Sequence, residues 1–397
     1  MKPSLTVVGG GIGGLTCAIA LRKKDVPVRV LERAHEIKAI GYGIQLGPNA
    51  FHAFEKLGIE KQVLEKCSLL DEGLLRDAES GEILLRLPMG QRLKDRFGKP
   101  YAVIHRADLH QILLDECVRQ DVELITDCEL VDFDDKEGRV DIQTTSGPLA
   151  ADALIAADGI LSRIRSNLLS PPEPRKLGYA AFRAVHPMEA MPKRCEARSV
   201  TLWCGGGYHM IHYPLRGGQL FNLVAAFDYT LEDSSNPSGP LPERLLERFS
   251  GACDEVRELL GFIDLSRHWE ISAFEPLATW SRGRVALLGD AAHAMLQAMA
   301  QGACQAIEDG VVLADCVAEA RGDVSVAFKD YQSKRLLRAT RVQYMSRFLW
   351  ELIHVRKGFS FLRRDLLAKY SESDVIEQLS WLYDSDAPQR GRYEPAL

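Results

Sequence analysis

The chain has 397 residues, of which 46% are hydrophobic and 26% are charged. This ordinary globular composition excludes disorder, collagen-like repeats and coiled coil for most of the chain, and the length suggests two to three domains. The net charge is −6 and there is no basic stripe, so nothing favours a nucleic-acid partner. No run of about 18 uncharged apolar residues predicts a membrane span. None of the nine cysteines lies in a C-x-x-C pair, so we expect free thiols in a reducing cytoplasm and no metal site.

The first 33 residues predict a strand, a glycine-rich turn, a helix and a second strand. The turn carries a G-x-G-x-x-G motif at Gly9, Gly11 and Gly14, and Glu32 and Arg33 end the second strand. Such glycines let a pyrophosphate approach the backbone, and the helix N-terminus stabilises its charge. Glu32 lies close to the position, about 20 residues after the motif, that is expected for a carboxylate holding a ribose hydroxyl. The motif therefore predicts a dinucleotide site, and it fits FAD and NAD equally.

Two later segments repeat the pattern of an apolar strand that ends at an aspartate beside a glycine and runs into a helix. The first ends at Asp158 and the second at Asp290. Asp290 suits the polyol chain of a flavin nucleotide, whereas a helix N-cap is the alternative for either aspartate. A long helix begins near Gly302 and Ala303. Its N-terminus would stabilise the negative charge of a reduced flavin, which favours FAD.

In this order the three segments resemble those of the single-component FAD-dependent aromatic hydroxylases, the family that includes p-hydroxybenzoate and salicylate hydroxylases. The resemblance covers roughly residues 4–345 and implies one FAD, with NADH or NADPH and O2 as co-substrates and a small aromatic acid as substrate. It places Arg106 beside the flavin and Gln45 along its ring. No second G-x-G-x-x-G motif joins a strand to a helix, so we expect the nicotinamide nucleotide to bind transiently.

The strand and helix patterns along the chain predict an α/β fold with an added antiparallel sheet. Strand signals and turn glycines over 177–275 predict the sheet, and a proline-rich linker at Pro171–Pro174 would precede it. Buried-strand character returns at 285–290, so the domains are interleaved. We expect a discontinuous, Rossmann-like FAD-binding domain at 1–75, 101–175 and 277–340. A β-sheet substrate-binding domain would occupy 76–100 and 176–276. A C-terminal helical region would occupy 341–397.

Three further residues define the predicted substrate pocket. Gln297 stands where family members usually carry a proline, after the Gly-Asp-Ala-Ala-His segment, and offers a hydrogen-bonding side chain there. If residues 208–214 form a strand, His209, Ile211 and Tyr213 share one face. The outer two Cα atoms would then lie about 13 Å apart, at about 3.3 Å per residue. Such a face would span a small hydroxylated benzoate, with a polar group at each end and an apolar floor.

The chain is similar to the subgroup of this family that hydroxylates 3-hydroxybenzoate at C6 to form gentisate. The matching stretches are Gly178–Arg183, Tyr213–Gly218, Leu296–Gln297 and Ala303–Asp309. This similarity assigns His209 and Gln297 to the phenol hydroxyl and Tyr213 to the carboxylate. We expect His209 to take the phenol proton, since the pKa of an ordinary histidine lies near neutrality. The alternatives are a decarboxylative hydroxylase of salicylate or 6-hydroxynicotinate, and a flavin-binding sensor without turnover. The C-terminal helices favour a homodimer, with contact to lipid as the alternative.

Overall fold

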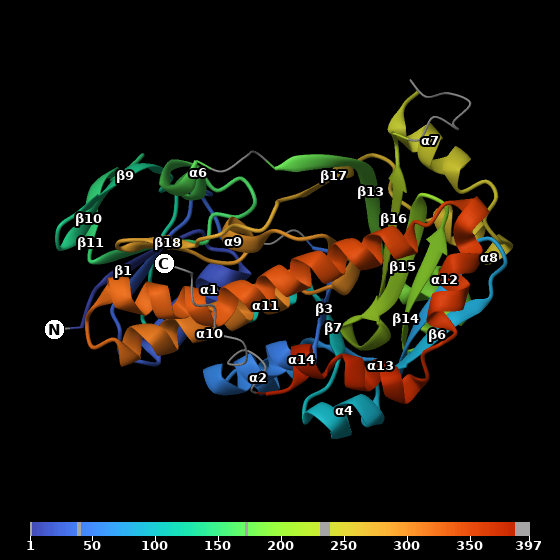
Figure 1. Ribbon diagram of the computed structural model, residues 1–397, viewed down its shortest axis with the longest axis horizontal. Helices are drawn as coiled ribbons and strands as arrows, with labels where there is room; N and C mark the ends of the chain where they lie inside the picture. Colours follow the sequence, from blue (N-terminus) through green and yellow to red (C-terminus); the bar gives the residue numbers. More distant parts are fainter. Residues whose placement is uncertain (1, 38–40, 171–173, 231–238, 386–397) are drawn as a thin grey trace.

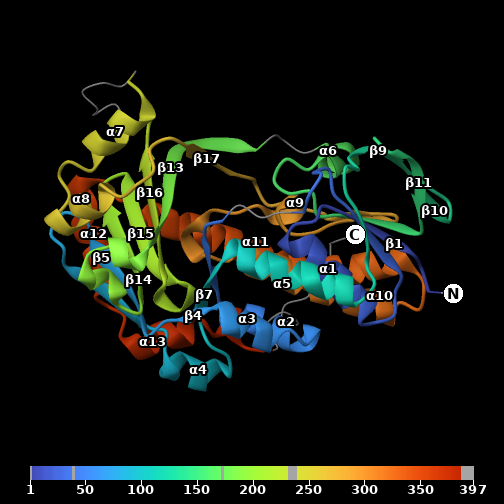
Figure 2. The same cartoon turned by 180° about the vertical axis from the view of Figure 1, so that it is seen from behind.

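The computed structural model describes residues 2–37, 41–170, 174–230 and 239–385. The molecule is elongated, with a Rossmann-like half at one end and a large mixed sheet at the other (Figures 1 and 2). The long helix α11 (Val324–Ile353) runs across both halves. Most of the predicted linker at 171–174 lies outside the described residues.

The Rossmann-like half is built on a six-stranded sheet in the order β18-β19-β12-β1-β2-β8. Its strands are short and their core members are almost entirely apolar, as expected when a parallel sheet is covered on both faces. All neighbours are parallel except the edge pair β18 and β19. In chain order the strands are β1 (Leu5–Val8), β2 (Val28–Leu31), β8 (Glu123–Ile125), β12 (Ala153–Ala156), β18 (Ser281–Arg282) and β19 (Val285–Leu287).

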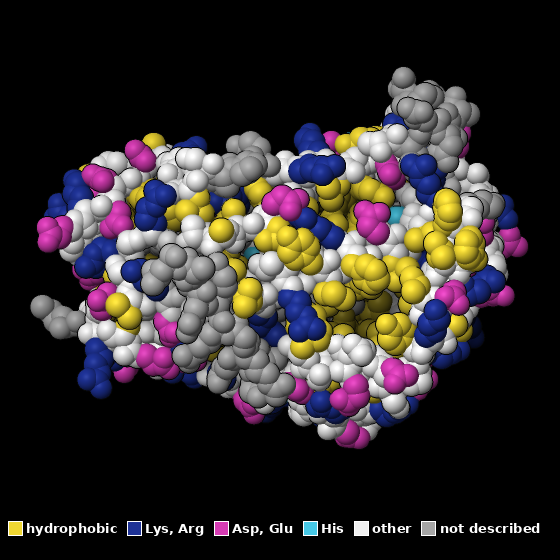
Figure 3. Space-filling view, viewed as in Figure 1, with side chains coloured by type: hydrophobic (Ala, Val, Ile, Leu, Met, Phe, Trp, Pro, Cys, Tyr) yellow, Lys and Arg dark blue, Asp and Glu magenta, His cyan; other side chains and the backbone are white. Residues whose placement is uncertain are grey.

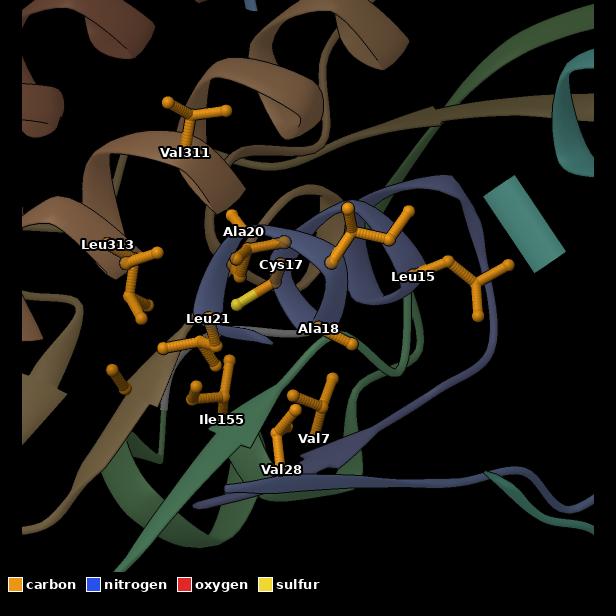
Figure 4. Close-up of a cluster of buried hydrophobic side chains, with 14 of the residues drawn as sticks. Val7, Leu15, Cys17, Ala18, Ala20, Leu21, Val28, Ile155, Val311 and Leu313 are labelled. Carbon is orange, nitrogen blue, oxygen red and sulfur yellow. The ribbon is translucent and has the colours of Figure 1, made fainter. Parts of the chain in front are cut away.

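Helix α1 (Ile12–Arg22) lies between this sheet and helix α10 (Gly302–Glu319). Figure 4 shows side chains of the sheet, such as Val7, pointing toward α1, and those of α10, such as Val311, on its opposite side. The two helices cross closely at Gly310, where an added Cβ would lie 2.8 Å from the backbone nitrogen of Cys17. This packing fixes the start of α10 relative to the glycine-rich turn that opens α1.

The other half contains a seven-stranded sheet in the order β17-β13-β16-β15-β14-β5-β6. The antiparallel sheet expected over 177–275 is confirmed, since all neighbours among β13 to β17 are antiparallel. From earlier in the chain, β6 pairs antiparallel with β5, and β5 runs parallel to β14. These two strands are joined by a long connection through the Rossmann-like half, so no hairpin imposes an antiparallel pairing. The strands are β5 (Glu72–Asp77), β6 (Ile83–Pro88), β13 (Arg175–Pro187), β14 (Ser199–Gly205), β15 (Tyr208–Leu215), β16 (Leu220–Asp228) and β17 (His268–Ala273).

Two helices interrupt the region in which only strands were expected. They are α7 (Leu241–Arg248) and α8 (Asp254–Leu260). Leu245 and Phe249, four residues apart, are buried against the sheet, and Val256 and Leu259 repeat a helical spacing. The periodicity of apolar residues over 241–260 therefore signals helices, which the composition of the surrounding segment had obscured.

Smaller elements complete the described part of the chain. One three-stranded sheet contains β3 (Gly43–Leu46), β7 (Ala102–His105) and β4 (Ser68–Leu69), and another contains β11 (Gly147–Ala151), β10 (Arg139–Thr144) and β9 (Leu130–Lys136). The remaining α-helices are α2 (Pro48–Leu57), α3 (Glu60–Lys66), α4 (Gln91–Phe97), α5 (Arg106–Arg119), α6 (Arg163–Leu169), α9 (Asp290–His293), α12 (Ser360–Leu367), α13 (Glu372–Gln378) and α14 (Ser380–Tyr383). Within the ranges that the structure describes, no helix is long and apolar enough to cross a bilayer.

The α/β fold with a large added sheet and C-terminal helices is confirmed. The expected domain boundary between residues 75 and 76 falls inside β5, a strand of the seven-stranded sheet. The boundary between 340 and 341 falls inside α11. The division into domains stays a prediction.

A buried ionic cluster joins α10 to α11 in the Rossmann-like half. Arg335 Nε donates to Asp309 Oδ1 over 2.7 Å and its guanidinium also pairs with Glu308. Arg338 Nε donates to Glu308 Oε2 over 2.7 Å, and His293 Nε2 lies 2.6 Å from Asp309 Oδ2. Burial acts to raise the pKa of both carboxyls, but the cationic partners outweigh it and hold both pKa values below the usual range.

We expect the substitution Arg335→Leu to lower the free energy of unfolding by about 3–5 kcal/mol, because it removes the cation that two buried carboxylates share and leaves their charge undercompensated. The matched control is Arg364→Leu, which removes an exposed pair with Glu82 at 2.7 Å and should cost at most about 1 kcal/mol. Urea unfolding of both variants and the unsubstituted protein measures the difference. Equal losses in the two variants would contradict a structural role for the cluster.

Candidate active site

A cavity of about 650 Å³ lies between the two halves of the molecule. Its wall is formed by the glycine-rich turn, the loops after β19 and α9, one face of β15 and the carboxyl end of α11. Nine of the predicted site residues line it: Gly11, Gln45, Arg106, His209, Tyr213, Asp290, Gln297, Gly302 and Ala303. Residues far apart in the sequence are therefore brought to one site.

Gly9, Gly14 and Glu32 shape the turn from behind and do not line the cavity. An added Cβ at Gly14 would lie 2.0 Å from the carbonyl oxygen of Gly9, and Gly9 has a φ of +111°, so both positions require glycine. Glu32 Oε2 accepts a hydrogen bond from the Gly10 nitrogen over 2.8 Å. This bond holds the turn against the end of β2, and the carboxylate remains partly exposed beside it.

Arg33 and Asp158 also lie outside the cavity wall. Arg33 is exposed. Asp158 Oδ2 accepts a long hydrogen bond of 3.4 Å from the Ile164 nitrogen in the first turn of α6. Its Oδ1 is buried without a partner among the described residues, and burial raises the pKa of this carboxyl. Helix capping, the alternative weighed from the sequence, therefore accounts for one of its two oxygens.

The wall formed by Asp290 and the start of α10 fits a flavin nucleotide. The Asp290 carboxylate is exposed to the cavity and makes no hydrogen bond to the described residues. Its loop is held from behind, since the Gly289 nitrogen donates to Asp309 Oδ2 over 3.0 Å. Helix α10 has no side-chain cap at Gln301. Its first N–H groups are therefore available to a negatively charged group.

The predicted alternation along β15 is confirmed. His209, Ile211 and Tyr213 line the cavity, whereas His212 lies on the opposite face and accepts a hydrogen bond from Trp203 Nε1 over 3.0 Å. The two histidines therefore cannot share a ligand. In the described ranges, no group of three His, Cys, Asp or Glu side chains is arranged to hold a metal ion.

The expectation that His209 has a pKa near neutrality was wrong. Burial lowers the pKa of His209 to about 4, because a charged imidazole loses its hydration in this apolar position. His209 is therefore neutral at pH 7. Its Nδ1 lies 2.8 Å from Nε2 of His354, which caps the carboxyl end of α11. No local pattern marks this second histidine, since 145 residues separate the pair.

Gln297 is held by a second residue that sequence reasoning left without a role. Arg183 Nη2 donates to Gln297 Oε1 over 3.3 Å, and the Arg183 guanidinium lies 5.6 Å and 5.5 Å from the rings of Tyr42 and Trp269. With its Oε1 engaged, Gln297 keeps an amide nitrogen that has no partner among the described residues. Arg183 lies in a stretch that the family resemblance already used, which was the available signal.

Tyr213 closes the other end of the polar face. Its ring packs so tightly against β3 that an added Cβ at Gly43 would lie 2.4 Å from Tyr213 Cε2. Burial raises the pKa of Tyr213, so its hydroxyl stays protonated and can donate a hydrogen bond. Gln45, on the same β3 strand, accepts a hydrogen bond from Tyr101 over 2.6 Å.

The cavity continues beyond this polar face into a lobe lined by aliphatic side chains. Figure 3 shows the hollow between α11 and α13, surrounded by hydrophobic side chains. The lobe is formed by strands β5 and β6 and helices α11 to α13, through Leu74, Leu85, Leu87, Leu352, Leu367 and Ile376. Water entering from this side would meet an apolar surface before it reaches β15.

The model of the FAD-binding domain family matches residues 3–346, so the chain belongs to this family. Together with its relatives, this match identifies the protein as a flavin-dependent aromatic monooxygenase. The predicted FAD cofactor is confirmed. The chain is 38% identical to the 3-hydroxybenzoate 6-hydroxylase of Polaromonas naphthalenivorans, over 95% of this chain and 94% of that protein. It is 36% identical to 3-hydroxybenzoate 6-hydroxylase 1 of Aquipseudomonas alcaligenes, over 98% and 100%.

A solved structure shares the fold. Klebsiella pneumoniae HpxO complexed with FAD and uric acid superposes with a TM-score of 0.84 at 25% identity, covering 98% of this chain and 97% of that one. The cavity wall described above therefore belongs to a fold that holds FAD in a related protein. Both relatives are named as hydroxylases, which gives no support to the alternative of a flavin-binding sensor without turnover.

We expect Asp290→Asn to weaken FAD binding, because a carboxylate is a stronger acceptor than an amide for a hydroxyl group. Hydrogen bonds to charged groups contribute about 1.5–3 kcal/mol. This corresponds to a dissociation constant roughly 10- to 100-fold higher. Flavin fluorescence during dialysis measures it, with Asp365→Asn, at an exposed pair with Lys369, as the control. Full retention of FAD by the Asp290 variant would remove that residue from the cofactor site.

Proposed function

We propose that the protein hydroxylates 3-hydroxybenzoate to gentisate, using FAD, NADH or NADPH, and O2. The observation that carries the proposal is the polar face of the cavity, with His209 and Gln297 at one end, Tyr213 at the other and Ile211 between them. This face stands beside the wall that fits FAD. The names of two relatives that match nearly the whole chain support the same substrate.

FAD held by Asp290 and the start of α10 would supply, together with the nicotinamide nucleotide and O2, the electrophilic oxygen atom that the reaction needs. The residues of the cavity must therefore hold the ring, make it electron-rich and exclude water. Neutral His209 accepts a hydrogen bond from the phenol hydroxyl. It takes the proton as positive charge develops on the attacked ring and the phenol becomes more acidic. The aliphatic wall keeps water from the reacting centre.

Gln297 and Tyr213 orient the substrate at its two polar ends. The amide nitrogen of Gln297 donates to the phenol oxygen while Arg183 holds its Oε1. The hydroxyl of Tyr213 donates to the carboxylate. Arg183 and Arg106 both line the cavity and bring positive charge to it, which favours an anionic acid over a neutral phenol.

The oligomeric state and location follow as parts of this proposal. Tyr344 and Phe348 are more than half exposed and lie four residues apart on α11, which supports a homodimer that covers them. Light scattering in solution tests it. All nine cysteines are free, which suits the reducing cytoplasm.

We expect His209→Ala to lower the rate of gentisate formation by about 10²–10⁴-fold, the usual contribution of a general base. FAD content should stay unchanged, and NADH oxidation should continue with release of hydrogen peroxide. Product chromatography set against NADH consumption measures the coupling. The control is His268→Ala, at an exposed position on β17. Unchanged coupling in the His209 variant would remove that residue from the reaction.

A panel of acids separates the proposed reaction from decarboxylative hydroxylation. We expect 3-hydroxybenzoate to stimulate NADH oxidation and oxygen uptake and to give gentisate without CO2. Salicylate and 6-hydroxynicotinate should give no more than slow turnover, since their hydroxyl groups do not lie where His209 and Gln297 meet a 3-hydroxyl. Release of CO2 from either acid at the higher rate would favour the decarboxylative alternative.

A further inference from the structure

A chain of two histidines leads from the cavity to the end of α11. His209 lies on β15, and its Nδ1 is 2.8 Å from Nε2 of His354. The other ring nitrogen of His354, Nδ1, is 2.7 Å from the carbonyl oxygen of Trp350. All three residues are buried. The hydrogen bonds therefore run in one line from the cavity to the backbone of the helix.

The positions of the protons in this chain follow from the chemistry of its last member. A carbonyl oxygen only accepts hydrogen bonds, so Nδ1 of His354 carries a hydrogen. A neutral imidazole carries one hydrogen, which leaves a lone pair on Nε2 of His354. Nδ1 of His209 must then donate to it, and the lone pair of His209 is left on Nε2. That atom has no partner among the described residues.

Both rings are neutral in the resting protein. Burial lowers the pKa of His354 well below its usual value, and neighbouring His209 and Arg363 act in the same direction. Burial alone lowers that of His209. A protonated His354 would turn its Nε2 into a donor and reverse the direction of the bond.

We propose that His354 is a positioning residue that fixes His209 in the Nδ1–H tautomer and so makes its Nε2 a hydrogen-bond acceptor toward the substrate. This inference rests on the proposed function for its consequence, because an acceptor is what a phenol hydroxyl requires. In the opposite tautomer, His209 would present N–H to the phenol oxygen and could not take the phenol proton.

The same pair of hydrogen-bonded histidines stabilises the proton once His209 has taken it. A second hydrogen on His209 gives an imidazolium whose Nδ1–H already points at His354. Positive charge shared with His354 lies at the C-terminus of a 30-residue helix, where the helix dipole favours a cation. The relay therefore lets a buried, uncharged site hold a proton for the length of one reaction.

Local packing holds His354 in place. Its ring centroid lies 4.5 Å from that of Trp350 and 4.8 Å from that of Tyr179, and its carbonyl oxygen accepts a hydrogen bond from the Gly207 nitrogen over 3.2 Å. Gly207 belongs to the turn just before β15. The strand that carries His209 is thus tied to the helix end that carries its partner.

Nitrogen NMR of protein labelled with ¹⁵N-histidine tests the tautomer directly, with the holoenzyme and no substrate. Ring nitrogen shifts distinguish a protonated from an unprotonated atom, and the His209→Ala variant assigns the signals. We expect His209 to carry its hydrogen on Nδ1 and His354 on Nδ1. A hydrogen on Nε2 of His209 overturns the proposal, whatever the enzyme turns over.

Two substitutions test the consequence. His354→Gln keeps an oxygen that can accept from His209, whereas His354→Leu removes every acceptor. We expect the Leu variant to lose at least about tenfold in hydroxylation rate, part of the 10²–10⁴-fold that a general base contributes. The KM for 3-hydroxybenzoate should change less than the rate, and more NADH should be spent on peroxide. The Gln variant should recover most of the loss.

Each possible result of these experiments bears either on the positioning role of His354 or on the proposed function. Equal loss in folded Gln and Leu variants, or none in the Leu variant, contradicts the positioning role. If either variant fails to fold, the tautomer measured in the unsubstituted protein decides alone. Absence of 3-hydroxybenzoate turnover in the unsubstituted enzyme contradicts the proposed function. The tautomer of His209 is then still decided by the nitrogen NMR spectrum.

Discussion

The ion pairs between α10 and α11 are the contact on which the site depends. Asp309 bonds Arg335, His293 and the Gly289 nitrogen at once, so one buried carboxylate joins a long helix, the motif histidine and the loop that presents Asp290. A buried ion pair is a weak source of stability compared with a well-packed apolar contact. The ion pairs matter here for geometry, because they form only when α10 and α11 lie in one position relative to each other along the helix axes.

Much of the cofactor half could be predicted from the sequence, because its signals are local. Two of the three motif positions, Gly9 and Gly14, require glycine because an added Cβ there would lie 2.3 Å and 2.0 Å from a backbone carbonyl oxygen. His354 could not be predicted in this way. Its role arises from contact with His209, on a strand 145 residues earlier in the chain. The residues next to His354 in the sequence mark it only as a histidine at the end of a helix. The low pKa of His209 could not be predicted for the same reason, since it depends on burial of the side chain by α11.

Gln297 and Arg183 illustrate a departure from the family pattern that has a structural explanation. A proline at 297 has no side-chain acceptor, so the guanidinium of Arg183 would lose its hydrogen bond to Oε1. Arg183 is otherwise flanked by the rings of Tyr42 and Trp269, which stabilise its charge without fixing its direction. Glutamine therefore gives both residues a defined orientation.

Helix α11 relates the two ends of the site. Arg335 and Arg338 fix its height against the cofactor wall, and His354 at its carboxyl end meets His209 on the substrate wall. Arg335 and His354 are 19 residues apart, about 28 Å along a helix that rises about 1.5 Å per residue. A continuous helix changes length very little. One continuous element therefore carries both the arginines that meet the acidic residues of α10 and the histidine that meets His209, so the two walls of the cavity share a single support.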